Sequence, residues 1–234
     1  MEPEKTTLYI VATPIGNMED ITLRALRILK EVDVVLCEDT RVTKKLLSKY
    51  EIDTPTMSYH AHSQASKHEK IIEMLREGKN LALVSDAGTP TISDPGVMLV
   101  AQVRKDLPEV DVVPIPGVSA VITALSASGI PSSEFLFLGF LPHKKGRETL
   151  FKEIATTKRT TVFYESPHRV MKTLESLRTF LKEGDGEGRV ITIGRELTKI
   201  HEQIISGTAE ELIVYFEDHP DKVRGEFVVV VEGL

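Results

Sequence analysis

Short apolar runs alternate with amphipathic stretches along the chain, and this alternation predicts strands separated by helices. In the first half of the chain, strands are predicted at residues 7–12, 32–37, 56–60, 80–86 and 110–115, and helices at 21–32, 40–50, 70–78 and 96–106. In the first helix, Leu23, Leu26 and Leu29 recur every three residues, which predicts that they form its buried face. Strands separated by helices of about ten residues indicate βα units around a mostly parallel sheet.

Two prolines and a glycine at residues 114–117 interrupt this pattern and predict a domain boundary. We therefore expect an N-terminal α/β domain over residues 1–116 and a C-terminal α/β domain over residues 117–234. In the second half, strands are predicted at 135–140, 160–166, 189–194 and 226–233, and helices at 118–128, 146–156, from 167 onward, and at 208–217. More of this half is strand, so a mixed sheet is expected, with residues 183–189 as a solvated loop.

Composition and charge narrow the class of protein. Of 234 residues, 41% are hydrophobic and 27% charged, as in folded soluble chains. The apolar runs are too short to span a membrane, the first residues are acidic where a signal peptide is basic, and there is a single cysteine. These features predict a cytoplasmic protein with no membrane partner. The net charge is −6, so bulk positive charge cannot attract nucleic acid, although a local basic patch could.

Polar turns follow several of the predicted strands of the first half. They comprise residues 12–17, 38–41 and 85–90, the last extending to 93–96. In an open parallel sheet, ligands bind at the carboxyl ends of the strands. A single such turn is as well explained by helix capping, but three at one sheet edge favour a binding site.

Common motifs for other chemistries are absent. There is no GxGxxG after the first strand and no GxxxxGK[ST], so neither nucleotide motif applies. His60 and His62, two apart on a predicted strand, have no cysteine or acidic cluster to complete a metal site, and no metal is expected. Cys37 is expected in the core, and Ser166 lacks the GxSxG context of a hydrolase.

Eight segments, taken together, carry a resemblance to a known family. They are VATPIGNMEDITLRAL, CEDTRVTKKLL, LVSDAGTPTISDPG, PIPGVSA, GFLPHKKG, FYESPHR, GRELTKIHE and GEFVVVVEG, in this order from residue 11 to residue 233. The set resembles the family of bacterial 2′-O-ribose methyltransferases of 16S rRNA, a branch of the tetrapyrrole methylase superfamily. The sequence also departs from the family's common pattern at several positions; for example, Thr91 replaces a common glycine and Val118 a common proline.

The resemblance implies a homodimer of two-domain α/β subunits with S-adenosylmethionine bound in a cleft between the domains. It implies transfer of a methyl group to the ribose 2′-hydroxyl of a cytidine in 16S rRNA, within the 30S ribosomal subunit or as free rRNA. Carried onto this sequence, the cofactor-binding residues would be Pro14, Ile15, Asp86, Gly88, Thr89, Ser119, Ala120, Tyr164, Glu165, Gly194 and Arg195.

The methyl group of a sulfonium is already electrophilic, so the protein's main contribution to catalysis is to align the attacking hydroxyl oxygen with the methyl–sulfur bond. A base or cation near the hydroxyl would help to remove its proton. The candidate catalytic residues are Glu38, Arg41, Glu165 and Arg169, with Asp39 also facing the expected cleft. For Glu38 and Arg41, a structural ion pair at a strand end is an equally good interpretation.

An acidic protein needs a clustered basic surface to hold RNA. The densest basic run contains Lys144, Lys145 and Arg147, and His168 and Arg169 stand at a predicted helix start. This run is interpreted either as a solvated helix start or as a loop that contacts RNA phosphates.

Two other functions remain open from the sequence. A tetrapyrrole C-methyltransferase of corrinoid or sirohaem synthesis would share the fold and cofactor, although CEDTR and FYESPHR stand against it. A non-catalytic module would bind S-adenosylmethionine or RNA without turnover.

Overall fold

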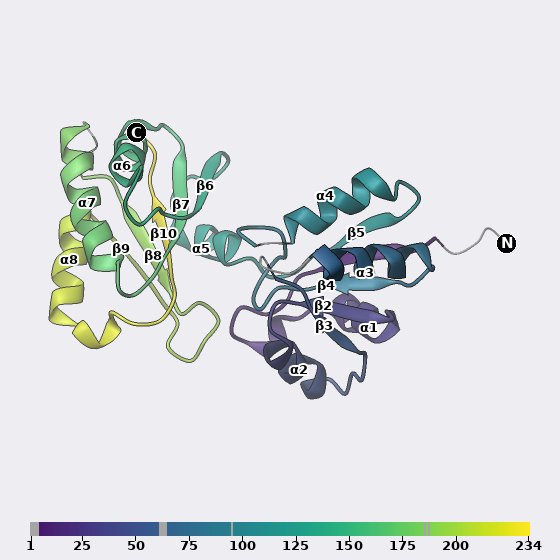
Figure 1. Ribbon diagram of the computed structural model, residues 1–234. Helices are drawn as coiled ribbons and strands as arrows, with labels where there is room; N and C mark the ends of the chain where they lie inside the picture. Colours follow the sequence, from purple (N-terminus) through teal and green to yellow (C-terminus); the bar gives the residue numbers. More distant parts are fainter. Residues whose placement is uncertain (1–4, 61–64, 95, 185, 187) are drawn as a thin grey trace. The chain divides into compact units, whose positions relative to one another are not determined.

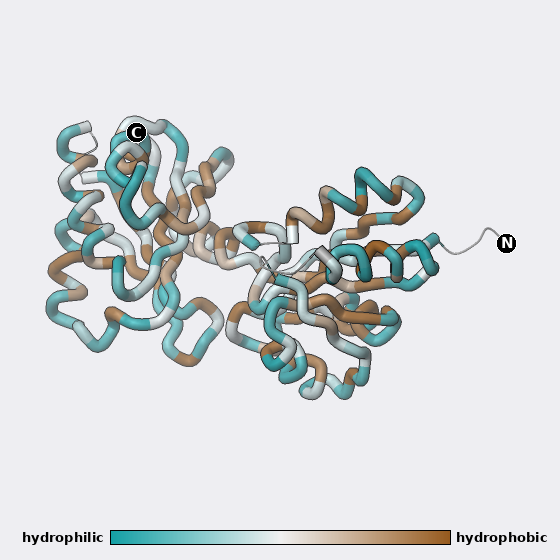
Figure 2. The backbone as a smooth tube through the Cα atoms, in the orientation of Figure 1, coloured by the Kyte–Doolittle hydropathy of each residue, from teal (hydrophilic) through white to brown (hydrophobic). Residues whose placement is uncertain are grey.

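The computed structural model describes residues 5–60, 65–94, 96–184, 186 and 188–234. The chain forms two compact units, the first ending at Ser119 and the second running from Ala120 to Leu234 (Figure 1). In both, the more hydrophobic stretches follow the central strands, while the helices alternate between hydrophobic and hydrophilic residues (Figure 2). Among the described residues, no helix combines the length and the apolarity needed to span a bilayer.

The first unit contains a parallel sheet with strand order β3-β2-β4-β1-β5. Its strands are β1 (Thr7–Val11), β2 (Val34–Cys37), β3 (Thr56–Ser58), β4 (Leu81–Leu83) and β5 (Asp111–Ile115). Its helices are α1 (Leu23–Glu31), α2 (Thr40–Lys49), α3 (Ala65–Arg76) and α4 (Val97–Asp106), with a 3-10 turn at Met18–Asp20. Pro114 lies in β5, an edge strand, where a missing backbone N–H is tolerated.

Alternate strand residues of this sheet face opposite helical layers. Leu8, Leu36 and Leu81 pack in the core under α3 and α4. Val35 and Ala82 pack in the core under α1 and α2. Successive side chains of a strand point to opposite faces of the sheet, and both faces of this sheet are covered by helices. Most residues of the central strands β1, β2 and β4 are therefore buried, which is why these strands appear in the sequence as continuous apolar runs.

The buried face of α1 differs from the predicted one. Leu23 is 86% exposed, whereas Ala25, Ile28 and Leu29 are buried. Ile28 and Leu29 follow Ala25 by three and four residues, so these three side chains share the side of the helix that faces the sheet. Leu23, in the first turn, points away from the sheet. The expectation that Leu23 belongs to the buried face is therefore wrong.

The second unit contains a mixed sheet with strand order β6-β7-β10-β8-β9, in which only the β6–β7 pair is parallel among the described strands. Its strands are β6 (Phe135–Phe140), β7 (Thr160–Glu165), β8 (Ile191–Arg195), β9 (Gln203–Gly207) and β10 (Phe227–Val231). Its helices are α5 (Ala120–Ser128), α6 (Arg147–Thr156), α7 (Val170–Glu183) and α8 (Ala209–Asp218), with a 3-10 turn at Pro220–Lys222. The predicted α/β class, with a mostly parallel first sheet and a mixed second sheet, is confirmed.

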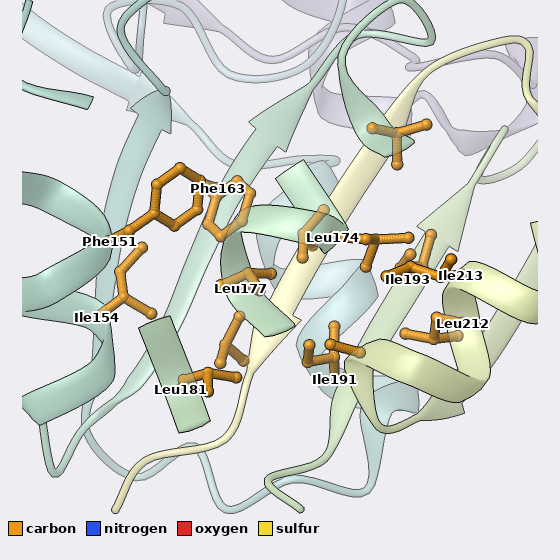
Figure 3. Packing of buried hydrophobic residues seen from close by; sticks show 14 of the residues in the cluster. Phe151, Ile154, Phe163, Leu174, Leu177, Leu181, Ile191, Ile193, Leu212 and Ile213 are labelled. Atoms are coloured by element: carbon orange, nitrogen blue, oxygen red, sulfur yellow. The ribbon is translucent and has the colours of Figure 1, made fainter. Parts of the chain in front are cut away.

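Helices α6, α7 and α8 cover one face of this sheet and share one core with it (Figure 3). Phe151 of α6, Leu177 of α7 and Leu212 of α8 pack in this core with Phe163 of β7 and Ile193 of β8. Helix α5 packs against β8, β9 and β10 instead. The sheet is thus buried on both faces at its centre, and less so at the edge strand β6.

Residues 183–189 were expected to form a solvated loop, but Arg189 is buried. Its Nε donates to the carbonyl oxygen of Glu232 at 2.6 Å, and its Nη1 donates to the carbonyl oxygens of Ile154 and Ala155 at 3.0 and 3.1 Å. The guanidinium thus hydrogen-bonds to carbonyls near the end of α6 and just after β10. The expectation of a solvated loop is therefore wrong for Arg189.

Candidate functional site

The loops after β1 and β4 are joined at the carboxyl edge of the first sheet. The backbone N–H of Thr13 donates to the carbonyl oxygen of Gly88 at 2.9 Å, and that of Gly88 donates to the carbonyl of Thr13 at 3.0 Å. The Thr13 hydroxyl also donates to the carbonyl oxygen of Ser85 at 3.1 Å. These bonds hold two of the predicted polar turns against each other.

A pocket of about 200 Å³ opens beside these joined loops. It is lined by Thr13, Pro14, Ile15, Gly16, Met18, Val42, Thr43, Leu46, Ser85, Asp86 and Ala87. Three of the predicted cofactor-binding residues, Pro14, Ile15 and Asp86, therefore line one pocket. Its volume is below the roughly 300 Å³ at which pockets for whole small molecules begin, so it suits one part of a larger ligand.

Gly88 and Thr89 extend this surface toward the segment that follows β5. Gly88 has φ +81°, and a Cβ there would lie 3.4 Å from the Cγ2 of Ile15. The Thr89 hydroxyl donates to the carbonyl oxygen of Val118 at 3.1 Å, and Ser119 follows directly in the chain. The structure thus connects the predicted residues of three separate turns within the first unit.

Glu38 stands at the end of β2, half-buried and beside other carboxylates. Burial, followed by a hydrogen bond with Asp94 and the negative charges of Asp94 and Asp86, raises the pKa of Glu38 to about 7. Asp86 is also held close to this strand end, because its Oδ1 accepts the Asp39 N–H at 3.0 Å. A carboxyl group with this pKa exchanges a proton near neutral pH.

Arg41 pairs with Asp39 and not with Glu38. Its Nη2 lies 2.6 Å from the Oδ2 of Asp39, and its Nε lies 3.0 Å from Oδ1. These hydrogen bonds to Arg41 lower the pKa of Asp39 to about 2. The interpretation of Arg41 as part of a structural ion pair at a strand end is therefore confirmed, with Asp39, which caps α2, as the partner in place of Glu38.

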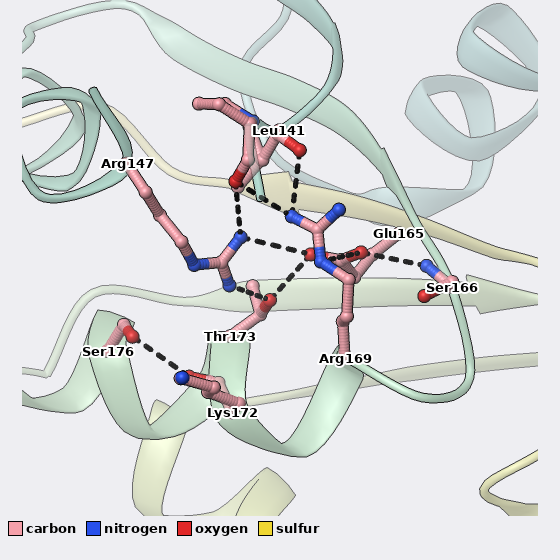
Figure 4. A network of polar contacts seen from close by, with 9 residues as sticks. Leu141, Arg147, Glu165, Ser166, Arg169, Lys172, Thr173 and Ser176 are labelled. Carbon is pink, nitrogen blue, oxygen red and sulfur yellow. Dashed lines mark hydrogen bonds and ion pairs between the residues drawn. The ribbon is translucent and has the colours of Figure 1, made fainter. Parts of the chain in front are cut away.

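In the second unit, Glu165 at the end of β7 is the centre of a buried polar network (Figure 4). Its side chain is 0% exposed, its Oε2 accepts the Thr173 hydroxyl at 2.6 Å, and its Oε1 accepts the Ser166 N–H at 2.8 Å. Two guanidinium groups flank it, with Arg147 Nη1 3.7 Å from Oε2 and Arg169 Nε 3.3 Å from Oε1. A carboxylate enclosed in this way is suited to holding its neighbours in place.

The same two arginines hold the loop that follows β6. Arg169 Nη2 donates to the carbonyl oxygens of Leu141 and Pro142 at 2.7 and 3.1 Å, and Arg147 Nη1 donates to that of Pro142 at 3.4 Å (Figure 4). Arg147 Nη2 also donates to the Thr173 hydroxyl at 2.7 Å, and burial lowers the pKa of this guanidinium. These bonds fix the backbone between β6 and α6.

This network divides the predicted RNA-binding residues into two groups. Lys144, Lys145 and His168 are exposed. Arg147 is buried, and the Arg169 side chain is 16% exposed. The idea of a solvated basic run therefore holds for the lysines but not for Arg147, whose guanidinium turns inward to Glu165 and Thr173.

Apart from Ala120, the remaining predicted residues of the second unit lie at the carboxyl ends of β7 and β8. Tyr164 and Gly194 both pair with Val228 of β10, so one strand separates them. Arg195 is buried and donates to the carbonyl oxygens of Arg224 at 2.8 Å and His201 at 3.2 Å. Its side chain thus holds neighbouring loops, while Ala120 begins α5.

The histidines do not share a strand as expected. Strand β3 ends at Ser58, before His60, and His62 lies outside the described residues. His68 of α3 lies 3.2 Å from the Tyr59 hydroxyl and 3.2 Å from Gln102 Oε1. In the part of the chain that the structure describes, no cluster of three or more His, Cys, Asp or Glu residues could hold a metal ion. Cys37 lies in the core, as expected.

Comparisons with known proteins assign the family. Residues 7–213 match the model of the tetrapyrrole (corrin/porphyrin) methylases. The ribosomal RNA small subunit methyltransferase I of Bacillus subtilis is 50% identical over 229 residues, which cover 97% of this chain and 75% of that protein. The chain belongs to the ribosomal RNA small subunit methyltransferase I family of the tetrapyrrole methylases. Another family member, from Thermotoga maritima, is 46% identical over 97% of this chain and 98% of its own length.

Solved structures of more distant tetrapyrrole methylases share the fold of this family member. The methyltransferase CobJ has a TM-score of 0.70 at 18% identity, covering 97% of this chain and 94% of that one. The cobalt precorrin-4 methyltransferase CbiF has a TM-score of 0.68 at 20% identity, with the same coverage of both chains. At such low identity, these similarities establish the fold alone.

Two residues that contact the candidate site residues, Asp94 in the first unit and Thr173 in the second, were not anticipated. Asp94 lies in the polar turn at 93–96, and that turn was the available signal for it. Thr173 lies within α7, and nothing in the local sequence marks it as the hydroxyl that joins Glu165 to Arg147. Its role depends on residues 8 and 26 positions away in the chain.

Proposed function

We propose that this chain is an S-adenosylmethionine-dependent methyltransferase that methylates the ribose 2′-hydroxyl of a cytidine in the 16S rRNA of the small ribosomal subunit. The observation that carries the proposal is the identity of 46 to 50% over nearly the whole chain to proteins named ribosomal RNA small subunit methyltransferase I. Lower-identity neighbours that act on corrinoids or porphyrins support the fold only.

The first unit has a surface that fits a cofactor of this kind. Its pocket is lined mostly by small and apolar residues together with Asp86, and a Cβ at Gly88 would contact Ile15 beside it. When bound, S-adenosylmethionine supplies an electrophilic methyl group on a sulfonium. We propose that it is held by Pro14, Ile15, Asp86, Gly88, Thr89 and Ser119 of the first unit. For Ala120, Tyr164, Gly194 and Arg195, cofactor binding stays a prediction from the family resemblance.

Among the candidate catalytic residues, Glu38 is best suited to accept the proton of the ribose hydroxyl. With a pKa of about 7, it is roughly half ionised at neutral pH and can take up a proton in the reaction. Asp39 is a poor base because its pKa is about 2. Glu165 is enclosed by Thr173, Arg147 and Arg169, so we propose that Glu165 and Arg169 act by positioning the loop after β6.

The proposal is tested by methyl transfer to three substrates in parallel. Tritiated S-adenosylmethionine is incubated with the purified protein and 30S subunits, free 16S rRNA or a porphyrinogen. We expect label in rRNA, and comparison of the first two substrates identifies the preferred assembly state. Label in the porphyrinogen alone would instead indicate a tetrapyrrole C-methyltransferase, and binding without label in any substrate would indicate a non-catalytic module.

We also propose that the protein acts in the cytoplasm as a homodimer. Both statements rest on the family to which the chain belongs and on a small-subunit rRNA as its substrate.

A further inference from the structure

Phe140 presents an exposed aromatic ring at the end of the edge strand β6. Phe140 is 62% exposed, and its ring lies 5.2 Å from that of Tyr164, measured between centroids. Tyr164 is in turn 5.1 Å from Phe137 in an edge-to-face arrangement. Phe140 therefore packs against Tyr164, which itself packs on Phe137, and most of Phe140 remains exposed. Exposed aromatic groups of this kind are typical of binding surfaces.

A basic loop follows Phe140 directly in the chain. The carbonyls of Leu141 and Pro142 are held by Arg169, and exposed His143, Lys144 and Lys145 come next. Lys144 lies four positions after Phe140 in the chain, which is at most about 14 Å of extended backbone. Because the arginines fix the first part of this loop, the lysines extend from a held backbone within that distance of the ring.

We infer that Phe140 is a stacking platform for a base of single-stranded RNA, with Lys144 and Lys145 contacting the neighbouring phosphates. The inference rests on the proposed function, because it assumes an RNA substrate. Aromatic side chains stack on unpaired bases, while adjacent lysines neutralise the backbone. This arrangement would explain how a chain with a net charge of −6 can hold RNA.

Charge favours RNA over a second copy of this chain as the occupant. In a twofold contact, each copy presents the same patch to the other. A contact centred on Phe140 would thus bring the Lys144–Lys145 pairs of both copies toward one interface, where like charges repel. A polyanion has no such penalty, since the lysines complement its phosphates.

The test compares variants of the full chain by fluorescence anisotropy with a labelled single-stranded oligoribonucleotide from the decoding region of 16S rRNA. Phe140→Leu removes the aromatic face but keeps an apolar side chain, and Phe140→Tyr restores it. Phe135→Leu is the matched control, because Phe135 is 38% exposed on the same strand without the Tyr164 contact that Phe140 makes. Circular dichroism and S-adenosylmethionine calorimetry report whether each variant is folded.

We expect Phe140→Leu to weaken RNA affinity roughly 5- to 150-fold, as for the loss of one stacked base. Phe140→Tyr and Phe135→Leu should bind like the unchanged protein. The slope of log affinity against log salt should not change in Phe140→Leu, since no phosphate contact is lost. In Lys144→Ala with Lys145→Ala, the slope should flatten by roughly one to one and a half units.

Unchanged RNA affinity in Phe140→Leu would overturn the inference, as would an equal loss in Phe135→Leu. A shift from dimer to monomer in Phe140→Leu without a change in RNA affinity would overturn it too and would assign the patch to a subunit contact. Methyl transfer by the unchanged protein is measured separately. If it methylates no rRNA but binds the oligonucleotide through Phe140, the proposed function fails and the stacking platform stands.

Discussion

Glu38 has a pKa well above the ordinary value of a glutamate. Its pKa of about 7 predicts that the rate of methyl transfer rises with pH through the neutral range, because only the ionised carboxylate accepts a proton. Glu38→Gln should lower the rate about 10²- to 10⁴-fold and remove this dependence. Single-turnover transfer of tritiated methyl to rRNA across the neutral range measures both. A Glu38→Gln variant with the original rate and profile would exclude Glu38 as the base.

The raised pKa of Glu38 also affects stability, which provides a readout independent of activity. The pKa rises from 4.5 to about 7 on folding, so the stabilising contribution is fully present below pH 4.5 and is lost as the pH rises to about 7. The Tm of Glu38→Gln relative to the unchanged protein should therefore be higher on the alkaline side of pH 7 than near pH 4.5. An equal difference at both values would contradict the raised pKa.

Gly88 is the residue at which the cofactor part of the proposal can be tested without rRNA. In Gly88→Val, the new side chain would enter the space against Ile15, so we expect S-adenosylmethionine binding to be lost by calorimetry. Gly129→Val is the control, because Gly129 also has positive φ, at +70°, but nothing lies within 4 Å of a Cβ there. If both variants remain folded by circular dichroism and bind equally well, this surface does not hold the cofactor.

At the scale of elements, the network around Glu165 joins the loop after β6, the end of β7 and the start of α7. Glu165→Gln would leave two guanidinium groups without their carboxylate, and removing one partner of a buried ion pair costs roughly 3–5 kcal/mol. Urea denaturation measures the loss. Glu148→Gln is the control, because the Glu148–Lys152 pair is exposed and its removal should change stability far less. Equal effects would mean that the network does not stabilise the unit.

The sequence predicted most elements, because hydrophobic periodicity reflects local geometry. Strand β9 was missed, since its residues are only partly buried or exposed and show no apolar run. The partners of Arg147 were missed for a different reason, because Glu165 and Thr173 come from elsewhere in the chain and become neighbours only through packing.

Thr91, which replaces a common glycine, has φ +73°, so the backbone keeps the left-handed conformation that glycine favours.

At the scale of the whole molecule, the expected assembly is a homodimer. Sedimentation should give a mass of about twice the 26.0 kDa subunit at micromolar concentration. We expect a dimer because of the family to which the chain belongs. The sedimentation measurement needs neither cofactor nor substrate. A monomer would contradict the proposed assembly while leaving the methyl-transfer chemistry in place.

The central claim is that the methyl group is placed on a ribose oxygen of small-subunit rRNA, and the nature of the modified nucleoside tests it most directly. After reaction with 30S subunits and S-adenosylmethionine, the 16S rRNA is digested to nucleosides and analysed by mass spectrometry. We predict one new nucleoside, 2′-O-methylcytidine, in which the added mass stays with the ribose on fragmentation. Added mass on the base, or rRNA unmodified while a tetrapyrrole is methylated, would contradict the claim.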